Sequence, residues 1–492
     1  MNQILNIKED YQFNKKNALI FCLAVAVMLL IYFLPSPPDL HKGTEAIPLT
    51  HEGKAVCAVL IYAVILWITE ALPFSVTAVS LMIIITIMGV DSFGNVAKAG
   101  MGSTTILFLM GCMGISGAIT VSGLANRIML VILSRVGIRT DRILFAFIGV
   151  ATLLSMWVTD MAVAAMLLPL GVSILQGCGC KPLQSNFGRA LMIGIVWGAL
   201  FGGTATPAGC GANVLAMQYV RDIAGLNVSF GQWMAVGVPG ALIMWPVGWF
   251  LLMKFFPPEI KELTVKPESI KEDLVALGPL SRKEKNTVVV FFITVFLWLF
   301  GAKVGLDFDE AFVALIGFFL LFLPGLRVFD SWKDVSKEID WGGLILIAGG
   351  ISAGLMLAST GAARYAAWGA LSGIGALHPI LRVMAVLVMV ELLKIFFSSN
   401  SVTGAVVLPL IVTLAVDLGM NPWVIAGPAG IATSMAFIMV TSSPTNVIPY
   451  SSGYFSIKDF AKVGIWMTVA GILIVTFSVA VFGKFAGMNI WM

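Results

Sequence analysis

Two short polar tripeptides interrupt long apolar runs of the sequence, and their residue types suit the binding of an anion. Thr159-Asp160-Met161 lies within MWVTDMAVAAMLLPL, and Ser399-Asn400-Ser401 lies within FFSSNSVTGAVVLPL. A helix that begins after such an interruption directs its unpaired N–H groups, and the positive end of its dipole, at the gap. The second tripeptide adds hydroxyl and amide donors. Two such helix starts that face one another would suit a molecule with a negative group at each end.

Two further loops combine proline, small residues and asparagine, and they favour a cation. They are TATPAGCGAN and TSSPTN. Proline has no backbone N–H and leaves an upstream carbonyl free, and free carbonyls and hydroxyls suit a hard cation such as Na⁺. The simpler alternative is a helix kink with Ser/Thr back-bonding. The predicted substrate-binding residues of the tripeptides and loops are Thr159, Asp160, Ser399, Asn400, Ser401, Thr206, Pro207, Ser443, Pro444 and Thr445.

The composition places these motifs in a membrane. Hydrophobic residues make up 59% and charged residues 11% of the chain, and the mean hydropathy is +0.97, whereas a soluble domain carries about 25% charged residues. Several charge-free runs reach the roughly 20 apolar residues that a helix needs to cross the hydrocarbon core. The sequence therefore predicts an all-α polytopic protein of the lipid bilayer with about 11 spans. The net charge of +4 gives no reason to expect a nucleic-acid partner.

Basic residues set the expected orientation. Lys15 and Lys16 precede the first span, and the longest charged loop, Glu259 to Asn286, is rich in Lys. Both are expected in the cytoplasm. The segment before residue 17 contains acidic residues and does not resemble a signal peptide. We expect the first span to remain as an anchor in the cell membrane, taken as a bacterial plasma membrane, with a cytoplasmic N-terminus.

Signals of an enzyme or a metal centre are weak. Cys178-Gly-Cys180 has the form of a ligand pair, but no second Cys or His pair accompanies it. His41, His51 and His378 fall in loops or at span ends. The sequence contains no HExxH motif. We therefore expect a protein that is not an enzyme and that uses no metal or cofactor.

The chain contains a repeat with a spacing near 240 residues. Thr159 and Ser399 are 240 residues apart, and so are Pro169 and Pro409. Further landmarks follow in the same order, which argues against chance similarity of apolar helices. We divide the chain into residues 1–50 (N-terminal segment, first span and external loop), 51–256 (first inverted repeat), 257–286 (cytoplasmic linker) and 287–492 (second inverted repeat and C-terminal span).

Two Gly- and Ser-rich stretches, Gly102 to Arg127 and Trp341 to Ala363, are awkward as single spans. We interpret both as re-entrant hairpins that enter and leave on one side of the membrane. Irregular backbone is tolerated at that depth only where protein or water covers it. Arg127 and Arg364, at the ends of these segments, are expected to snorkel or to neutralise helix C-termini.

On these motifs the sequence resembles the divalent anion/sodium symporters, which carry citrate, succinate, malate and related acids. The hallmark of that family is a Ser-Asn-Thr loop in each repeat, followed by an apolar segment that ends in Leu-Pro. Ser399-Asn400-Ser401 with Leu408-Pro409 is similar to it, as is Thr159-Asp160-Met161 with Leu168-Pro169. The resemblance covers nearly the whole chain. It implies about 11 spans plus two hairpins, a homodimer, and elevator-type movement of a transport domain that holds the substrate between hairpin tips and loops.

The departures from the family pattern concern the cation sites. In sodium-coupled members the first Ser-Asn-Thr loop serves both substrate and Na⁺, whereas here Asp160 replaces its Asn and Met161 its Thr. Lys394 lies in the apolar stretch before Asn400, and Glu391 lies three residues earlier on the same helical face. We expect the Lys394 ammonium to stand where Na⁺ would bind in one half. A vestigial Na⁺ site in the other half would comprise Ser155, Thr159, Asp160, Asn213 and Asn446.

Two alternatives concern these embedded charges, each of which needs a partner at membrane depth. Lys394 could snorkel near a helix end and pair with Glu391, without a role in transport. Asp160 could act as a counter-ion, or as a protonatable carboxylate that couples H⁺ to uptake.

A fixed ammonium cannot be released on the far side as Na⁺ can, so the carrier would return most readily with another anion bound. The sequence thus predicts an exchanger of C4–C5 dicarboxylates (succinate, malate, fumarate, 2-oxoglutarate), like the family's 2-oxoglutarate/malate and citrate/succinate translocators. Na⁺-coupled symport of di- or tricarboxylates is the nearest alternative. An inorganic-anion or arsenite permease, or a channel subunit, comes next. The sequence does not decide which acid is preferred, and citrate stays open.

Overall fold

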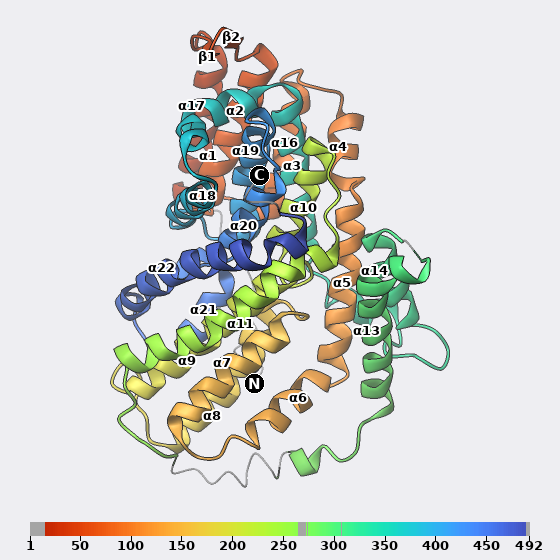
Figure 1. The fold of residues 1–492 in the computed structure, drawn as a ribbon, viewed down its shortest axis with the longest axis vertical. Coiled ribbons are helices and arrows are strands. Elements are labelled where there is room, and N and C mark those ends of the chain that lie inside the picture. The colour runs from red at the N-terminus through yellow and green to blue at the C-terminus, as the bar shows by residue number, and fades with distance from the viewer. Residues whose placement is uncertain (1–14, 264–271, 273, 307, 489–492) are drawn as a thin grey trace.

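The computed structural model describes residues 15–263, 272, 274–306 and 308–488. Over these residues the chain is helical apart from a small hairpin of β1 (Leu40–Lys42) and β2 (Glu45–Ile47) (Figure 1). Nine helical segments of the described chain are long and apolar enough to cross a membrane. The prediction of an all-α polytopic membrane protein is confirmed. Fewer segments meet that length than the roughly 11 expected, and four further apolar helices of the described chain are only 10–17 residues long.

After α1 (Lys15–Phe33), two series of helices follow in the same order. The first series is α2 (His51–Thr69), α3 (Phe74–Ile87), α4 (Phe93–Met101), α5 (Thr104–Val121), α6 (Leu124–Leu133), α7 (Thr140–Ser155), α8 (Asp160–Gly177), α9 (Asn186–Ala205), α10 (Gly211–Ala224) and α11 (Phe230–Phe255). The second series is α13 (Arg282–Phe300), α14 (Glu310–Leu320), α15 (Trp332–Ser336), α16 (Trp341–Ser359), α17 (Ala362–Leu371), α18 (Pro379–Lys394), α19 (Asn400–Asp417), α20 (Trp423–Thr433), α21 (Pro444–Tyr450) and α22 (Ile457–Phe482). Short 3₁₀ turns are η1 (Ala302–Val304), η2 (Ser372–Ala376), η3 (Val440–Ser442) and η4 (Gly483–Ala486).

The two series pack against one another in crossed pairs. α3 packs against α16 while α14 packs against α5, and α10 packs against α19 while α21 packs against α8. Glycine allows the close approach of α3 to α16 and of α5 to α14. A Cβ at Gly349 would lie 2.7 Å from the Cβ of Ala78, and a Cβ at Gly111 would lie 2.8 Å from the Cβ of Ala314. Small residues let helix backbones approach closely in a membrane. Helices of each series therefore pack against helices of the other series.

The two Gly-rich stretches are not re-entrant hairpins, so that prediction was wrong. Residues 104–121 form the single helix α5, and residues 341–359 form the single helix α16. The physical reason is that their glycines serve packing instead of turning. Gly350, for example, meets Ala405 of α19, where an added Cβ would lie 2.6 Å from the alanine Cβ.

The helical hairpins lie instead at the polar tripeptides. Along α9, Gly198 approaches the Ile148 carbonyl of α7 and Gly202 approaches the Thr152 carbonyl, so α7 and α9 run in parallel. α8 runs the opposite way, since its Gly171 lies beside Met192 while Asp160 lies beside Gly203. The chain therefore reverses at residues 156–159, which we name the first tip. The sequence indicates the interruption and not this reversal.

The second hairpin has the same form. Arg382 near the start of α18 contacts the Met420 sulfur just beyond the end of α19, at 3.2 Å. The two helices are therefore antiparallel, and the chain reverses at residues 395–399, the second tip. α8 and α19 each begin directly after a tip, so the predicted helix starts are present although the geometry around them differs.

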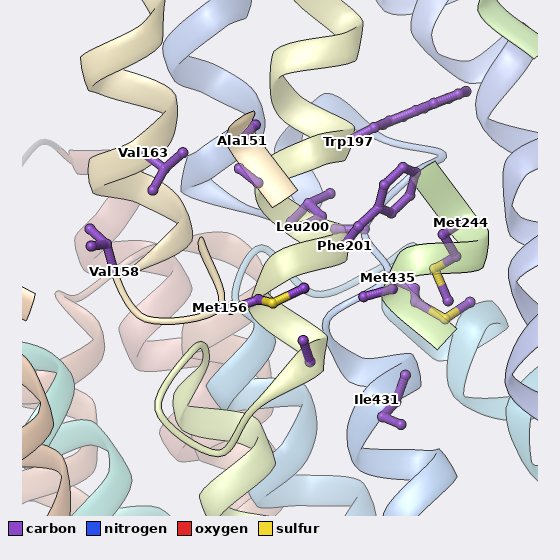
Figure 2. Close-up of a cluster of buried hydrophobic side chains, with 14 of the residues drawn as sticks. Ala151, Met156, Val158, Val163, Trp197, Leu200, Phe201, Met244, Ile431 and Met435 are labelled. Atoms are coloured by element: carbon purple, nitrogen blue, oxygen red, sulfur yellow. The ribbon is translucent and has the colours of Figure 1, made fainter. Parts of the chain in front are cut away.

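Apolar packing holds the first tip in place. Met156 and Val158 are buried in a cluster formed by α7, α9, α11 and α20, which includes Trp197 and Phe201 (Figure 2). Burial of side chains of this size is worth about 1.5–3 kcal/mol each. The backbone of the tip is thus fixed by the burial of its own apolar side chains.

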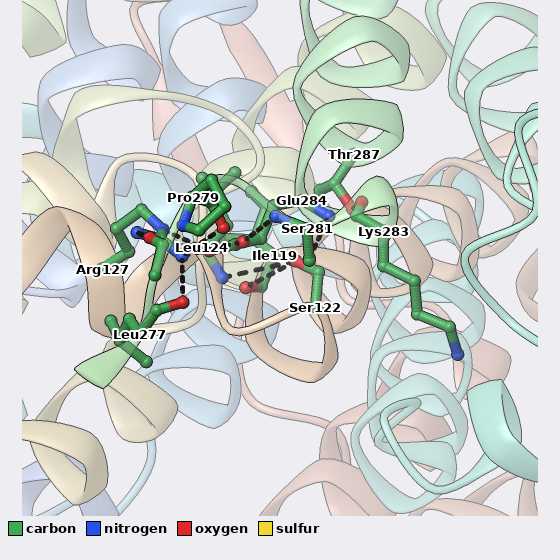
Figure 3. A network of polar contacts seen from close by, with 11 residues as sticks. Ile119, Ser122, Leu124, Arg127, Leu277, Pro279, Ser281, Lys283, Glu284 and Thr287 are labelled. Atoms are coloured by element: carbon green, nitrogen blue, oxygen red, sulfur yellow. Dashed lines mark hydrogen bonds and ion pairs between the residues drawn. The ribbon is translucent and has the colours of Figure 1, made fainter. Parts of the chain in front are cut away.

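Arg127 ties α6 to the start of α13 (Figure 3). Its guanidinium donates to Glu284 Oε1 at 2.6 Å and to the carbonyls of Leu277 and Gly278 at 3.2 and 2.8 Å. Glu284 also completes a capping box with Ser281 at the start of α13. These carbonyls lie in residues 277–278, before α13, and a carboxylate that the sequence did not suggest joins them.

Arg364 has the corresponding place in the second series. It donates to both carboxylate oxygens of Glu45 at 2.8 and 2.9 Å and to Asp417 Oδ1 at 2.6 Å. The Lys42 ammonium lies 3.4 Å from Asp417 Oδ2. We call these four residues the outer cluster, because they join the β1–β2 hairpin, α17 and the end of α19.

Acid is expected to loosen the outer cluster. The hydrogen bond from Arg364 lowers the pKa of the exposed Glu45 carboxyl below its ordinary value of 4.5. A pKa that is lower in the folded state gives a stabilisation that is present above the ordinary value and is lost as the pH falls through the lowered one. We expect an acid-active protease to cut residues 40–47 faster as the pH falls below about 4.5. Glu45→Gln, digested in parallel, should show no such change beyond the protease's own profile; identical profiles for both proteins would contradict this.

Candidate functional site

Both hairpins end at the loop between α9 and α10, residues 206–210. Nδ2 of Asn400, the first residue of α19, lies 3.8 Å from Cys210 Sγ. A Cβ at Gly211 would lie 3.0 Å from Ser401 Oγ. From the other hairpin, Asp160 Oδ2 lies 3.9 Å from the position of a Cβ at Gly203. The structure thus brings residues of the two predicted tripeptides to one place, with the loop between them.

The loop between α20 and α21, residues 434–443, closes the other side. α21, which begins at Pro444, packs against α8, which begins at Asp160. Ser443 Oγ accepts from the Thr445 N–H at 3.3 Å, and Pro444 occupies the first turn of α21, where a missing N–H costs nothing. The predicted residues of this loop therefore lie beside the first tip, and Ser443 is occupied as a helix cap.

Thr206 and Pro207 shape the first loop as their types suggested. Thr206 Oγ1 donates to the Met156 carbonyl of the first tip at 2.6 Å. Pro207 offers no N–H to the Gly203 carbonyl four residues upstream. Asn213 Nδ2 donates to that carbonyl at 2.7 Å and to the Thr206 carbonyl at 2.8 Å. The freed carbonyl is therefore held by an amide side chain.

Asn446 does in the second half what Asn213 does in the first. Its Nδ2 donates to the carbonyls of Ala436 and Met439, at 2.8 and 3.0 Å, which again lie ten and seven residues upstream. In the part of the chain that the structure describes, Oδ1 of both asparagines is buried and has no hydrogen-bond partner. Buried polar atoms without a partner are rare in native proteins, so these two oxygens are candidate ligands for a cation.

Lys394 and Ser155 occupy equivalent positions, as the last residues of α18 and α7. The Lys394 ammonium donates to the Ser442 carbonyl at 2.7 Å, and Ser442 Oγ donates to the Lys394 carbonyl at 3.2 Å. Ser155 Oγ is buried without a partner in the described residues. In one half an ammonium therefore satisfies a loop carbonyl, whereas in the other half a hydroxyl oxygen stays free.

Lys394 does not snorkel. Its side chain is only 2% exposed, and within the described chain it makes no ion pair with Glu391 or with any other carboxylate. Asp160 and Glu391 act on it through the electric field. The alternative of a helix-end lysine paired with Glu391 is therefore wrong.

The two helix starts differ. At α19, the Ser399 hydroxyl accepts from the Val402 N–H at 3.5 Å, and Asn400 Oδ1 is buried and unpaired in the described chain. At α8, Thr159 makes no capping bond, and Asp160 Oδ1 accepts from the Met161 N–H at 2.9 Å. A carboxylate of the protein itself therefore faces the α8 dipole, while at the α19 start Asn400 leaves its Oδ1 unpaired in the described chain.

Sequence reasoning missed three groups at this site. Cys210 contacts Asn400, the buried Ser434 hydroxyl has no hydrogen-bond partner in the described chain, and the Ser442 carbonyl receives Lys394. Their position within the two proline-bearing loop regions was the available signal. Among the described residues, no three His, Cys, Asp or Glu side chains are placed to hold a metal ion, and Cys178 and Cys180 have free thiols.

Paired hairpin tips between two interrupted helices, inside a bundle of apolar helices, define a helical membrane transporter. The chain belongs to the family of the sodium:sulfate symporter transmembrane region, whose model matches residues 15–489.

Curated relatives cover almost the whole chain. A membrane protein of Cupriavidus necator is 28% identical over 94% of this chain and 92% of its own length. A protein named sodium-dependent dicarboxylate transporter SdcS, from Staphylococcus saprophyticus, is 26% identical over 96% of this chain and 92% of its own.

Two solved structures share the fold. The YdaH transporter of Alcanivorax borkumensis superposes with a TM-score of 0.58, at 12% identity, over 96% of this chain and 98% of that one. MtrF of Neisseria gonorrhoeae superposes with a TM-score of 0.56, at 15% identity, over 95% and 94%. At this identity they support the fold alone.

Proposed function

We propose that the chain is a secondary transporter, and not an enzyme, that exchanges C4–C5 dicarboxylates such as succinate, malate, fumarate and 2-oxoglutarate without Na⁺ coupling. The observation that carries this is Lys394, a buried ammonium on the Ser442 carbonyl beside the two tips. The name of the staphylococcal relatives, sodium-dependent dicarboxylate transporter, supports the substrate class.

Each group at the site has a role in this proposal. The N–H groups at the start of α19 and the amide of Asn400 donate to one substrate carboxylate. Thr206, Ser401 and Thr445 face the rest of the substrate. Lys394 supplies the positive charge that Na⁺ supplies in a sodium-coupled carrier. Because this charge cannot dissociate, the loaded carrier returns with a second dianion, which is exchange.

The movement we propose is of the elevator type. The hairpins and interrupted helices, α7–α11 and α18–α22, would shift together against the crossed pairs of α3 with α16 and α5 with α14. We propose the two inverted repeats with the bounds given from the sequence, a homodimer, and a bacterial plasma membrane with a cytoplasmic N-terminus. The matched roles of Asn213 and Asn446 support the repeat.

Na⁺-coupled symport is the second candidate, and one observation favours it. Ser155 Oγ and Asn213 Oδ1 are buried oxygens of the first half without a hydrogen-bond partner in the described chain. Oxygen atoms of this kind suit Na⁺ as a co-transported substrate, held near Asp160. One such site together with Lys394 would couple fewer sodium ions than two sites.

An uptake assay with purified protein in liposomes distinguishes exchange from Na⁺-coupled symport. Labelled succinate is added outside, with or without succinate inside and with or without Na⁺. Exchange predicts uptake only into succinate-loaded liposomes and no effect of Na⁺, whereas symport predicts uptake into empty liposomes driven by a Na⁺ gradient. Transport of sulfate or arsenite instead of succinate would replace the dicarboxylate proposal with an inorganic-anion permease.

A further inference from the structure

Glu391 is a buried carboxyl that the proposed exchange does not use. It lies on α18 one turn before Lys394 and is 4% exposed. Its Oε1 has no hydrogen-bond partner in the described part of the chain. It faces the loop between α20 and α21 across a gap, lined also by Phe437 and Ser442, that is too narrow for a water molecule. Neither a hydrogen-bond donor of the described chain nor a water in that gap therefore solvates Oε1.

Few charges surround Glu391. Lys394 is the one charged group of the described chain that acts on it appreciably. The other helices packed on α18, namely α19, α20 and α22, bring no titratable side chain to it. Cys210 and Asp160 in turn act electrostatically on Lys394. Since the ammonium bonds to the Ser442 carbonyl, Glu391 is left without a direct ion pair.

The sum of these charges matters for a dianion. With Lys394, Asp160 and Glu391 all ionised, the site carries one positive and two negative charges, and it repels a dicarboxylate. In the empty site the field of the Lys394 ammonium favours the ionised form of Glu391 although burial opposes it. The two negative charges of a bound dianion add to the cost of that ionised form, so the carboxyl takes up a proton when the dianion binds. A proton on Glu391 makes the site neutral, so the amide donors of the second tip can then bind the substrate without net repulsion.

We propose that Glu391 is a proton-binding site linked to substrate binding: a dicarboxylate dianion and one proton from water enter together, and the proton forms the O–H bond of the Glu391 carboxyl. On release of the dianion the same O–H bond breaks and the proton returns to water. This inference rests on the proposed dicarboxylate transport and adds its linked ion. It makes each half-cycle of the exchange carry a proton with the substrate.

Linkage fixes the sign of the effect. If binding takes up one proton, the affinity for the dianion falls as the pH rises, by up to tenfold per pH unit. Fumarate is a suitable probe because, as a stronger acid than succinate, it stays fully ionised between about pH 6.5 and 8. A change in affinity over that range then reports on the protein and not on the ligand.

Calorimetry on the purified full-length chain tests the proposal. Titration with fumarate in two buffers of different ionisation enthalpy gives the number of protons bound per ligand. We expect about one for the wild type and none for Glu391→Gln, which keeps the shape of the side chain but cannot ionise. Glu310→Gln, a half-buried glutamate at the start of α14, is the matched control and should behave as the wild type.

The outcomes separate the inference from the proposed function. Fumarate binding without proton uptake in the wild type, or equal uptake by the wild type and Glu391→Gln, overturns the proton site while dicarboxylate transport stands. No fumarate binding and no succinate counterflow overturns both. If Glu391→Gln does not fold, Glu391→Leu takes its place, and the wild-type proton count is decisive without either variant.

Discussion

Replacement of Lys394 by alanine is expected to lower the rate of succinate exchange on the order of 100-fold. The ammonium is buried and donates to the Ser442 carbonyl at 2.7 Å. Its removal leaves that carbonyl unpaired and withdraws the positive charge that a dianion needs, and truncation of one partner of a buried charged contact costs about 2–5 kcal/mol. Initial rates of counterflow into succinate-loaded proteoliposomes, normalised to folded protein, measure the loss.

Lys54 provides a matched control. It is also a buried lysine, 6% exposed, and its ammonium donates to the Leu34 carbonyl at 2.6 Å, but it lies on α2 far from both tips in sequence. Lys54→Ala should reduce stability and leave the exchange rate per folded molecule unchanged. If Lys394 stands in for Na⁺, high Na⁺ on both sides should restore part of the exchange in Lys394→Ala and none in Lys54→Ala. Full counterflow by Lys394→Ala without Na⁺ would reject the idea.

The position of the site could be predicted from the sequence because polar groups are costly in hydrocarbon. Asp160 and Asn400 stand out in apolar runs, and the proline-bearing loops repeat their surroundings. The structure brings these segments together, since Asn400 Nδ2 lies 3.8 Å from Cys210 Sγ and α8, which begins at Asp160, packs against α21. The cost of a polar group in hydrocarbon can be judged from the residue and its sequence neighbours, so this prediction needs no knowledge of which helices pack together.

The direction of the chain at the tips could not be predicted in the same way. A helix start gives the same signal whether the preceding helix continues or reverses, so residues 156–159 looked like a break in one span. The re-entrant hairpins predicted from the Gly-rich stretches were wrong for a related reason. In Gly111 and Gly349 it permits contact between helices, and without knowledge of the partner helix that use cannot be distinguished from a turn.

The equivalence of Ser155 and Lys394 also required the structure. In sequence they are 239 residues apart and chemically unlike. Their shared place appears only when α7 and α18 are seen to end at the same point of two matching hairpins. Comparison of the halves shows a lysine in one at the position where the other has a serine whose hydroxyl oxygen is unpaired in the described chain.

Asn400→Asp is expected to weaken succinate binding by at least about 100-fold. The substitution keeps the size of the side chain and replaces an amide donor by a carboxylate at the start of α19. Two carboxylates placed together without a counter-ion cost several kcal/mol. The fold should persist, because a negative charge at a helix N-terminus interacts favourably with the helix dipole. Calorimetric titration with succinate measures the affinity, and the thermal midpoint reports the fold.

Asn421→Asp separates the loss of the donor from the general effect of a new charge at a helix start. Asn421 precedes α20, where its Oδ1 accepts from the Trp423 N–H at 3.0 Å and its Nδ2 donates to the Gly487 carbonyl at 3.2 Å. An aspartate there keeps the capping bond to Trp423 and should leave succinate affinity unchanged. Wild-type affinity in Asn400→Asp would show that the α19 start does not face the substrate. Equal losses in both variants would point to a general electrostatic effect instead of contact at Asn400.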